Sequence, residues 1–157
     1  MDYANAVPGA VFNADCTDIW SIPCDVALPS ATQNEVTEKD AKLLVKNGCQ
    51  CVGEGSNMSS TAEAAAYLVD SGILYLPAKA ANAGGVSVSG LEMTQNSTRL
   101  VWTAEEVDER LQRIMKDIFT NVDAAARTFG MEGNFVAGAN IAGFMKVAEA
   151  MKAQGCC

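Results

Sequence analysis

The chain has 157 residues, of which 49% are apolar and 19% are charged, so it is predicted to fold as one globular domain with a core of ordinary size. Its net charge of −8 argues against nucleic acid or an anionic membrane as the main partner, because both bind basic surfaces. We expect no membrane-spanning segment and no export signal, and therefore a cytoplasmic location.

The first half of the chain contains three short apolar segments that are typical of buried strands. Residues 1–23 before them are expected to be irregular, with 10–12 as a candidate short strand. Two helices are expected between the strands: Thr37-x-x-Asp40 resembles a helix cap, Ser60-x-x-Glu63 predicts a capping box, and glycines follow each helix. The expected strands are 24–28, 49–53 and 73–77. Strands joined by crossovers of this length predict an α/β fold with a parallel sheet.

A glycine-rich stretch, 79–93, follows the third strand and leads into another helix. Gly84 and Gly85 would let a ligand approach the backbone closely, but paired glycines are also common where two elements pack, so both interpretations remain open. Val86 and Ser89 would share a helix face and offer one apolar surface and one hydroxyl to the same molecule.

Two further helices are expected after residue 102. Thr103-x-x-Glu106 predicts a capping box for a helix of roughly 40 Å that ends at Gly130. The last helix carries a stripe of Met and Phe side chains, which indicates core or a contact with a neighbouring domain. We therefore divide the single unit 1–157 into a βαβαβ half of a dinucleotide-binding fold with its following helix, 1–102, and C-terminal helices, 103–157.

The cysteines and the absence of histidine limit the chemistry of the chain. The six cysteines, which include Cys49 and Cys51 on one strand face, form no Cys-x-x-Cys pair, so we expect structural thiols and no metal site. Without histidine the chain has no Ser-His-Asp or Cys-His nucleophile.

Small and polar residues follow all three expected strands. Ligands of parallel sheets bind at the carboxyl ends of the strands, so these turns are candidates for a site. The turns are 31–33, 55–57 and 79–89. Three of them at one sheet edge indicate binding more strongly than one would.

Four segments, in order and at the expected spacing, resemble the C-terminal part of hexameric-type glutamate dehydrogenases. They are 31–34 (ATQN), 54–58 (EGSNM), 79–96 around Asn82-Ala83-Gly84-Gly85, and 136–144 (VAGANIAGF). The resemblance covers about residues 20–155 and implies the late strands of a Rossmann-like sheet plus C-terminal helices. It also implies an oxidoreductase that interconverts L-glutamate with 2-oxoglutarate and ammonia while passing a hydride to NAD or NADP, and that assembles as a homo-hexamer.

The resemblance implies a role for each matching residue. It places Asn82 near the nicotinamide and Asn57 near its ribose, with Ser56 where alanine is more usual. Val86 and Ser89 would line the glutamate side chain, and branched-chain relatives have an apolar residue at the place of Ser89. A hydroxyl there can donate to a carboxylate but would be unpaired beside a leucine. The border of the cofactor groove is assigned to Ala31, Thr32 and Gln33.

Several parts of the family's machinery have no match in these residues. No strand is followed by a Gly-x-Gly-x-x-Gly fingerprint, and no lysine or aspartate matches the family's catalytic ones. We therefore expect no catalytic residue in this chain, an inactive isolated chain, and a piece of a longer enzyme. Resemblance to bacterial-type members favours NADP over NAD. The alternative is a stand-alone module that binds a nucleotide or anion, or that self-associates.

Overall fold

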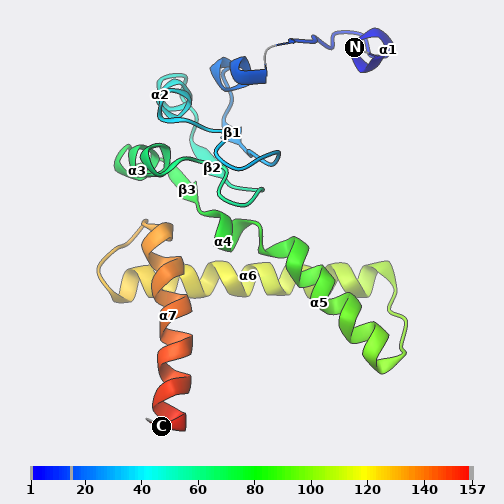
Figure 1. The fold of residues 1–157 in the computed structure, drawn as a ribbon, viewed down its shortest axis with the longest axis vertical. Helices are drawn as coiled ribbons and strands as arrows, with labels where there is room; N and C mark the ends of the chain where they lie inside the picture. The colour runs from blue at the N-terminus through cyan, green and yellow to red at the C-terminus, as the bar shows by residue number, and fades with distance from the viewer. Residues whose placement is uncertain (1, 15, 156–157) are drawn as a thin grey trace.

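The structure is a computed structural model that describes residues 2–14 and 16–155. Figure 1 shows a lobe that contains the sheet, a long arm made by α5 and α6, and α7 crossing α6. The strands are β1 (Val26–Ala27), β2 (Cys51–Gly53) and β3 (Leu74–Leu76). The helices are α1 (Asp2–Ala6), the 3-10 helix η1 (Cys16–Ser21), α2 (Glu38–Lys46), α3 (Ala62–Asp70), α4 (Ala78–Ala81), α5 (Ala83–Thr98), α6 (Ala104–Thr128) and α7 (Phe135–Gln154).

The sheet is parallel, in the order β1-β2-β3. Val26 pairs with Cys51, and Val52 pairs with Tyr75. The crossover helices α2 and α3 pack together on the same side of the sheet (Figure 1), as expected when successive crossovers of one hand add strands in one direction. The predicted α/β fold with a parallel sheet is confirmed.

The core lies on one face of this sheet. Ala27, Val52 and Tyr75 point toward α2 and α3 and are buried, together with Leu44 and Leu68 from those helices. Side chains alternate along a strand, so their neighbours point the other way. On that opposite face Val26 is 53% exposed and Leu74 42% exposed, so the chain leaves much of this face uncovered.

The predicted capping signals are confirmed at two helix starts and wrong at a third. Both halves of the capping box are present at Thr37 and at Thr103. Helix α3, however, begins one residue later than predicted, because Thr61 is its N-cap and accepts from the Ala64 N–H at 3.2 Å. Ser60 cannot serve as the cap since its backbone bridges to Val36 in the neighbouring turn.

Two other expectations fail near the N-terminus. Residues 10–12 form no strand: the Ala10 N–H donates to the nearby Val7 carbonyl at 3.2 Å, and Val11 is 92% exposed. Residues 2–6 are helical rather than irregular.

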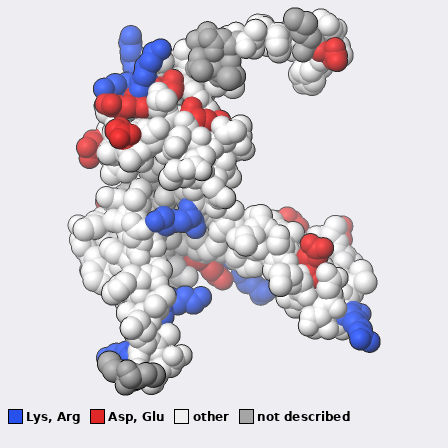
Figure 2. Space-filling view, in the orientation of Figure 1, with Lys and Arg blue, Asp and Glu red and all other residues white. Residues whose placement is uncertain are grey.

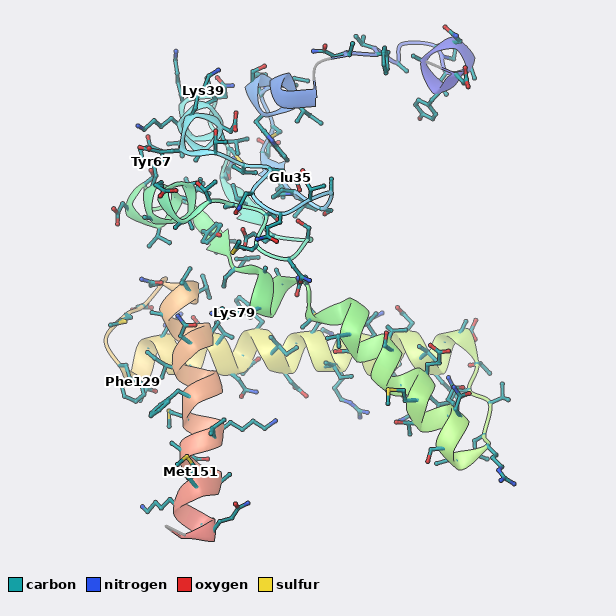
Figure 3. The ribbon with its side chains drawn as sticks, in the orientation of Figure 1. Glu35, Lys39, Tyr67, Lys79, Phe129 and Met151 are labelled. Carbon is teal, nitrogen blue, oxygen red and sulfur yellow. The ribbon has the colours of Figure 1, made fainter. Side chains whose placement is uncertain are left out.

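The stripe of Met and Phe side chains on α7 is not core at Phe144 or at Met151, whose side chains are 72% and 65% exposed. Figure 3 shows Met151 near the free end of that helix. A contact of this stripe with a neighbouring domain remains a prediction.

Helix α6 organises the C-terminal half. Its 25 residues span roughly 38 Å, close to the predicted length. Helix α5 packs against its N-terminal half, near Leu111 and Met115, and α7 crosses the same face nearer its C-terminal end, at Val122 and Ala126. Within residues 2–14 and 16–155, no helix combines the length and apolar composition that crossing a bilayer requires.

The burial of Tyr75 has a consequence for stability at alkaline pH. Its side chain is 4% exposed, and burial is the main cause that raises its pKa above the ordinary value of 10.0. The folded chain therefore retains the phenolic proton more tightly than the unfolded chain, and stability is lost as the pH rises above about 10, by at most about 1.4 kcal/mol per pH unit. Tyr75→Phe is expected to remove this loss in urea melts, whereas Tyr3→Phe, at a 74% exposed position, should leave it. Equal alkaline losses in the two variants would contradict the assignment.

Candidate functional site

The turns that follow β1 and β2 lie side by side at the carboxyl edge of the sheet. The Gly55 N–H donates to the Pro29 carbonyl at 2.9 Å, and the Asn34 N–H donates to the Met58 carbonyl at 2.8 Å. The Ser59 hydroxyl, which is fully buried, also donates to the Pro29 carbonyl, at 3.1 Å. Parallel strands end at one edge, so this adjacency follows from the topology.

Gly55 permits the close approach of these two turns. A Cβ at this position would lie 2.2 Å from Ser30 Oγ and 3.0 Å from Ser30 Cβ, so a larger residue would have to displace the Ser30 side chain. Beyond this contact the Ser56 hydroxyl donates to the Thr32 carbonyl at 3.2 Å. Two of the residues assigned to the cofactor groove, Thr32 and Ser56, therefore meet.

The first turn is shaped by Glu35, which the sequence reasoning did not single out. Its Oε1 accepts the Ala31 N–H at 2.9 Å and the Thr32 N–H at 3.3 Å. The side chains of Ala31, Thr32 and Gln33 are exposed. The acceptor lies three to four residues after the N–H groups that it binds, and this short separation in the sequence is the signal that could have indicated it.

The third segment joins the second turn through a pair of side-chain amides. Asn82 lies between α4 and α5, ending the first helix and preceding the second. Its Nδ2 donates to Asn57 Oδ1 at 2.6 Å. Asn57 is exposed and Asn82 half-buried, so the remaining amide donors and acceptors of the pair are available to a bound molecule.

The two glycines at the start of α5 face different surroundings. A Cβ on Gly84 would touch Leu111 of α6 at 3.6 Å, which is an ordinary packing contact. A Cβ on Gly85 would meet nothing within 4 Å. Both positions therefore have room for a Cβ; Gly84 faces α6, and the open side of the helix lies at Gly85.

Val86 and Ser89 lie one turn apart on the exposed side of α5, as the spacing predicts. Val86 is 72% exposed, and the Ser89 hydroxyl donates to the Gly85 carbonyl within the helix at 3.3 Å. No described contact joins them to the Asn57 and Asn82 amides. Figure 2 shows an open notch between the sheet lobe and the α5–α6 arm, on the side where α5 leaves α4.

An apolar hollow of about 400 Å³ adjoins this site, and the sequence reasoning missed it. It lies between the uncovered face of the sheet and α6, with Leu28 and Leu76 on one wall and Met115 and Phe119 on the other. Glu54 is the acidic residue of its lining. The hollow depends on how α6 is docked under the sheet, which no local sequence pattern encodes.

Lys79 does not point freely into the site. Its Nζ donates to Asn140 Oδ1 of α7 at 2.5 Å, and Figure 3 shows Lys79 between α4 and α7. Both residues belong to the segments that carried the family resemblance. The contact ties α4, which leads to Asn82, to the last helix.

The three thiols that the structure describes, Cys24, Cys49 and Cys51, form no disulfide. Burial, followed by the neighbouring Cys49, raises the pKa of Cys24 and of Cys51. Cys24 and Cys51 therefore remain protonated at neutral pH. The side chain of Cys16 and the residues Cys156 and Cys157 lie outside the described part of the chain.

A parallel half-sheet with neutral polar turns gathered at its carboxyl edge defines the class: these residues form part of a Rossmann-like α/β unit. Within that class, residues 1–155 match the family model described as Glutamate/Leucine/Phenylalanine/Valine dehydrogenase. The chain belongs to this family.

Its curated relatives are glutamate dehydrogenases. The chain is 60% identical over 140 residues to the glutamate dehydrogenase of Bacteroides thetaiotaomicron, covering 87% of the chain and 31% of the relative. It is 55% identical to the NADP-specific enzyme of Chlorella sorokiniana (93% and 28% covered) and 54% identical to the NAD-specific enzyme of Porphyromonas gingivalis (99% and 35% covered). The chain thus spans about a third of the length of the curated relatives it matches.

The fold agrees with this membership. The crystal structure of Plasmodium falciparum glutamate dehydrogenase superposes with a TM-score of 0.84 at 52% identity, covering 88% of this chain and 30% of the other. The family resemblance and the Rossmann-like fold expected from the sequence are confirmed.

The polar groups present fit one end of a nicotinamide dinucleotide better than the other. Amides and hydroxyls, such as those of Asn57, Asn82 and Ser56, can bond a carboxamide and ribose hydroxyls. The described turns offer no glycine-rich cradle for a pyrophosphate, and the Lys79 ammonium is engaged by Asn140. These residues therefore suit the nicotinamide half of the cofactor.

Proposed function

We propose that this chain forms one wall of the active-site cleft of an NAD(P)-dependent glutamate dehydrogenase, which interconverts L-glutamate with 2-oxoglutarate and ammonia. The observation that carries the proposal is the Asn57–Asn82 amide pair, which joins two segments 25 residues apart at the carboxyl edge of a parallel sheet. Family membership supplies the reaction class. Residues 1–102 would form the later half of the dinucleotide-binding fold, and residues 103–157 would form the C-terminal helices.

Each site residue then has a positioning task. Asn82 and Asn57 hold the nicotinamide carboxamide and its ribose, and Ser56 borders them. Ala31, Thr32 and Gln33 form the rim of the groove. The nicotinamide cofactor would supply the hydride chemistry, and this chain would orient its ring and exclude water.

The substrate side of the wall is assigned to α5. Val86 packs on the methylene groups of glutamate, and the Ser89 hydroxyl donates to the side-chain carboxylate. That donation requires Ser89 to exchange its weak bond to the Gly85 carbonyl for a charged acceptor, which is the stronger partner. No residue of this wall takes or gives the proton that the reaction needs.

NADP is the proposed cofactor, with NAD as the alternative. The NADP-specific and the NAD-specific relatives are 55% and 54% identical to the chain, so overall identity in these residues does not separate the two. The residue that reads the ribose phosphate lies after the glycine fingerprint in such folds.

A chimaera tests the proposed function. This chain would replace the matching segment of the Bacteroides thetaiotaomicron enzyme, and the chimaera is expected to reduce NADP or NAD with glutamate. Ser89→Ala should lower kcat/KM for glutamate by roughly 10-fold to 100-fold, the effect of losing a hydrogen bond to a charged group. Ser97→Ala, two turns further along α5, is the matched control and should leave kcat/KM unchanged. A well-folded chimaera without turnover would refute the proposal.

The isolated 157-residue chain is expected to show no glutamate-dependent reduction of NAD or NADP. It carries the wall but none of the acid–base residues that the family resemblance implies. The measurement is nicotinamide absorbance with the purified chain, using the chimaera as the positive control. Measurable turnover by the chain alone would contradict the assignment of the proton-transfer groups to other residues.

A second candidate role, self-association, is favoured by uncovered apolar surface. Leu28 beside β1 is 65% exposed, and Phe144 and Met151 of α7 are exposed to a similar extent. Burying such surface is favourable at about 25 cal/mol per Å². The mass of the isolated chain measured by light scattering is therefore expected to rise with concentration. A constant monomer mass would rule this role out.

A further inference from the structure

Glu54 is a buried carboxylate at the centre of the site that none of the roles above uses. It follows β2 directly and is 4% exposed. A buried carboxylate is costly unless both oxygens are satisfied, so its partners reveal what it does.

Both carboxylate oxygens of Glu54 accept from the backbone, and the two donors belong to different segments. Oε1 accepts the Ser60 N–H at 2.7 Å, at the end of the turn that carries Asn57. Oε2 accepts the Ala78 N–H at 2.8 Å, at the first residue of α4. Asn82 caps the C-terminal end of helix α4. One side chain therefore fixes the two segments from which Asn57 and Asn82 meet.

We propose that Glu54 is a positioning residue that holds the Asn57–Asn82 amide pair in place and, through this pair, determines where the nicotinamide binds. The bonds that it accepts are short and charge-assisted, and they join positions 60 and 78. Its effect on catalysis rests on the proposed function, whereas its effect on the amide pair does not.

Two variants of the chain test the link in different ways. In Glu54→Gln the amide oxygen of the new side chain can still accept one of the two backbone N–H groups. Its NH2 group is a donor and cannot accept the second N–H. Ala78→Pro instead removes the N–H donor and leaves Glu54 in place. Proline is tolerated at the first position of a helix, and Pro77 before it already has φ −69° and ψ 149°, the extended conformation that a following proline requires.

The measurement is NMR of the isolated chain, following the side-chain amide signals of Asn57 and Asn82 and the exchange rate of the Ser60 N–H. Both variants should shift the two side-chain amide signals. Glu54→Gln should also speed exchange of the Ser60 N–H by roughly tenfold, since its bond is weakened. Unchanged amide signals in either folded variant would overturn the proposal.

Asp40→Asn provides a matched control. Asp40 is also a buried carboxylate that accepts from the backbone, the Thr37 N–H at 2.9 Å, but it caps α2 away from the amide pair. This variant should lower the unfolding midpoint without moving the Asn82 signals. Equal shifts from Asp40→Asn would show that general loosening is the cause and would overturn the proposal.

Kinetics of the chimaera separate positioning from stability. Glu54→Gln should raise KM for the cofactor by roughly tenfold and change kcat less, and Glu54→Asp, which keeps the charge but is shorter, should restore part of that loss. Loss of kcat with unchanged KM for the cofactor would overturn the proposal. If the unsubstituted chimaera is inactive, the proposed function fails, and the NMR measurements still decide the role of Glu54.

Discussion

Gly138→Val is expected to lower the free energy of unfolding by about 3 kcal/mol, the upper range for overpacking a tight contact. Gly138 lies where α7 crosses α6, and a Cβ there would stand 2.4 Å from the Val122 carbonyl oxygen and 3.1 Å from the Ala126 Cβ. The obstacle is backbone, which cannot rotate away, so the two helices must separate. Urea unfolding followed by circular dichroism measures the loss.

Gly143→Ala on the same helix is the matched control. A Cβ at Gly143 would meet nothing within 4 Å, so alanine should add its helix propensity and stabilise the chain by roughly 0.5–1 kcal/mol. Opposite signs for the two glycines are the expected result. If Gly138→Val does not lower the free energy of unfolding relative to Gly143→Ala, the close crossing of α6 and α7 does not hold the chain together.

Leu68→Ala is expected to cost about 2–5 kcal/mol, the range for emptying a buried leucine site. Leu68 of α3 is fully buried in the cluster between the helices and the sheet. The cavity left behind cannot collapse easily, because the surrounding side chains come from both crossover helices and from the strands. The free energy of unfolding from urea melts measures the effect.

Leu28→Ala is the comparison that tests the one-sided core. Leu28 follows β1 but is 65% exposed on the uncovered face, so its loss should change the stability of the monomer by less than about 0.5 kcal/mol. A large cost at Leu28 would mean that this face is covered in solution, which is the outcome that self-association predicts. Repeating the melt at two protein concentrations distinguishes the two cases, because only an assembled state depends on concentration.

The motifs and the local signals of the chain were accurate for the elements that carry the site. The capping boxes at Thr37 and Thr103 formed as predicted, since a cap needs only residues three positions apart. Gly48 and Gly72 end their helices with positive φ, as glycine allows. The failure at Ser60 shows the limit of such signals: its backbone was taken by Val36, a partner 24 residues away in the chain.

The sequence by itself therefore determined the parallel α/β class, the family, and the turns in which Asn57, Asn82 and Ser56 reside. The class and the turns depend on short-range patterns of apolar residues, caps and glycines, which act within a few residues of chain, whereas the family was implied by the resemblance of four segments. The tertiary structure decided that Asn82 donates to Asn57 and that Glu54 bridges positions 60 and 78. It also decided that Gly84 packs on α6 while Gly85 stays open. Those facts depend on how distant segments are placed against one another, because a side chain finds its partner only after the strands and helices have docked.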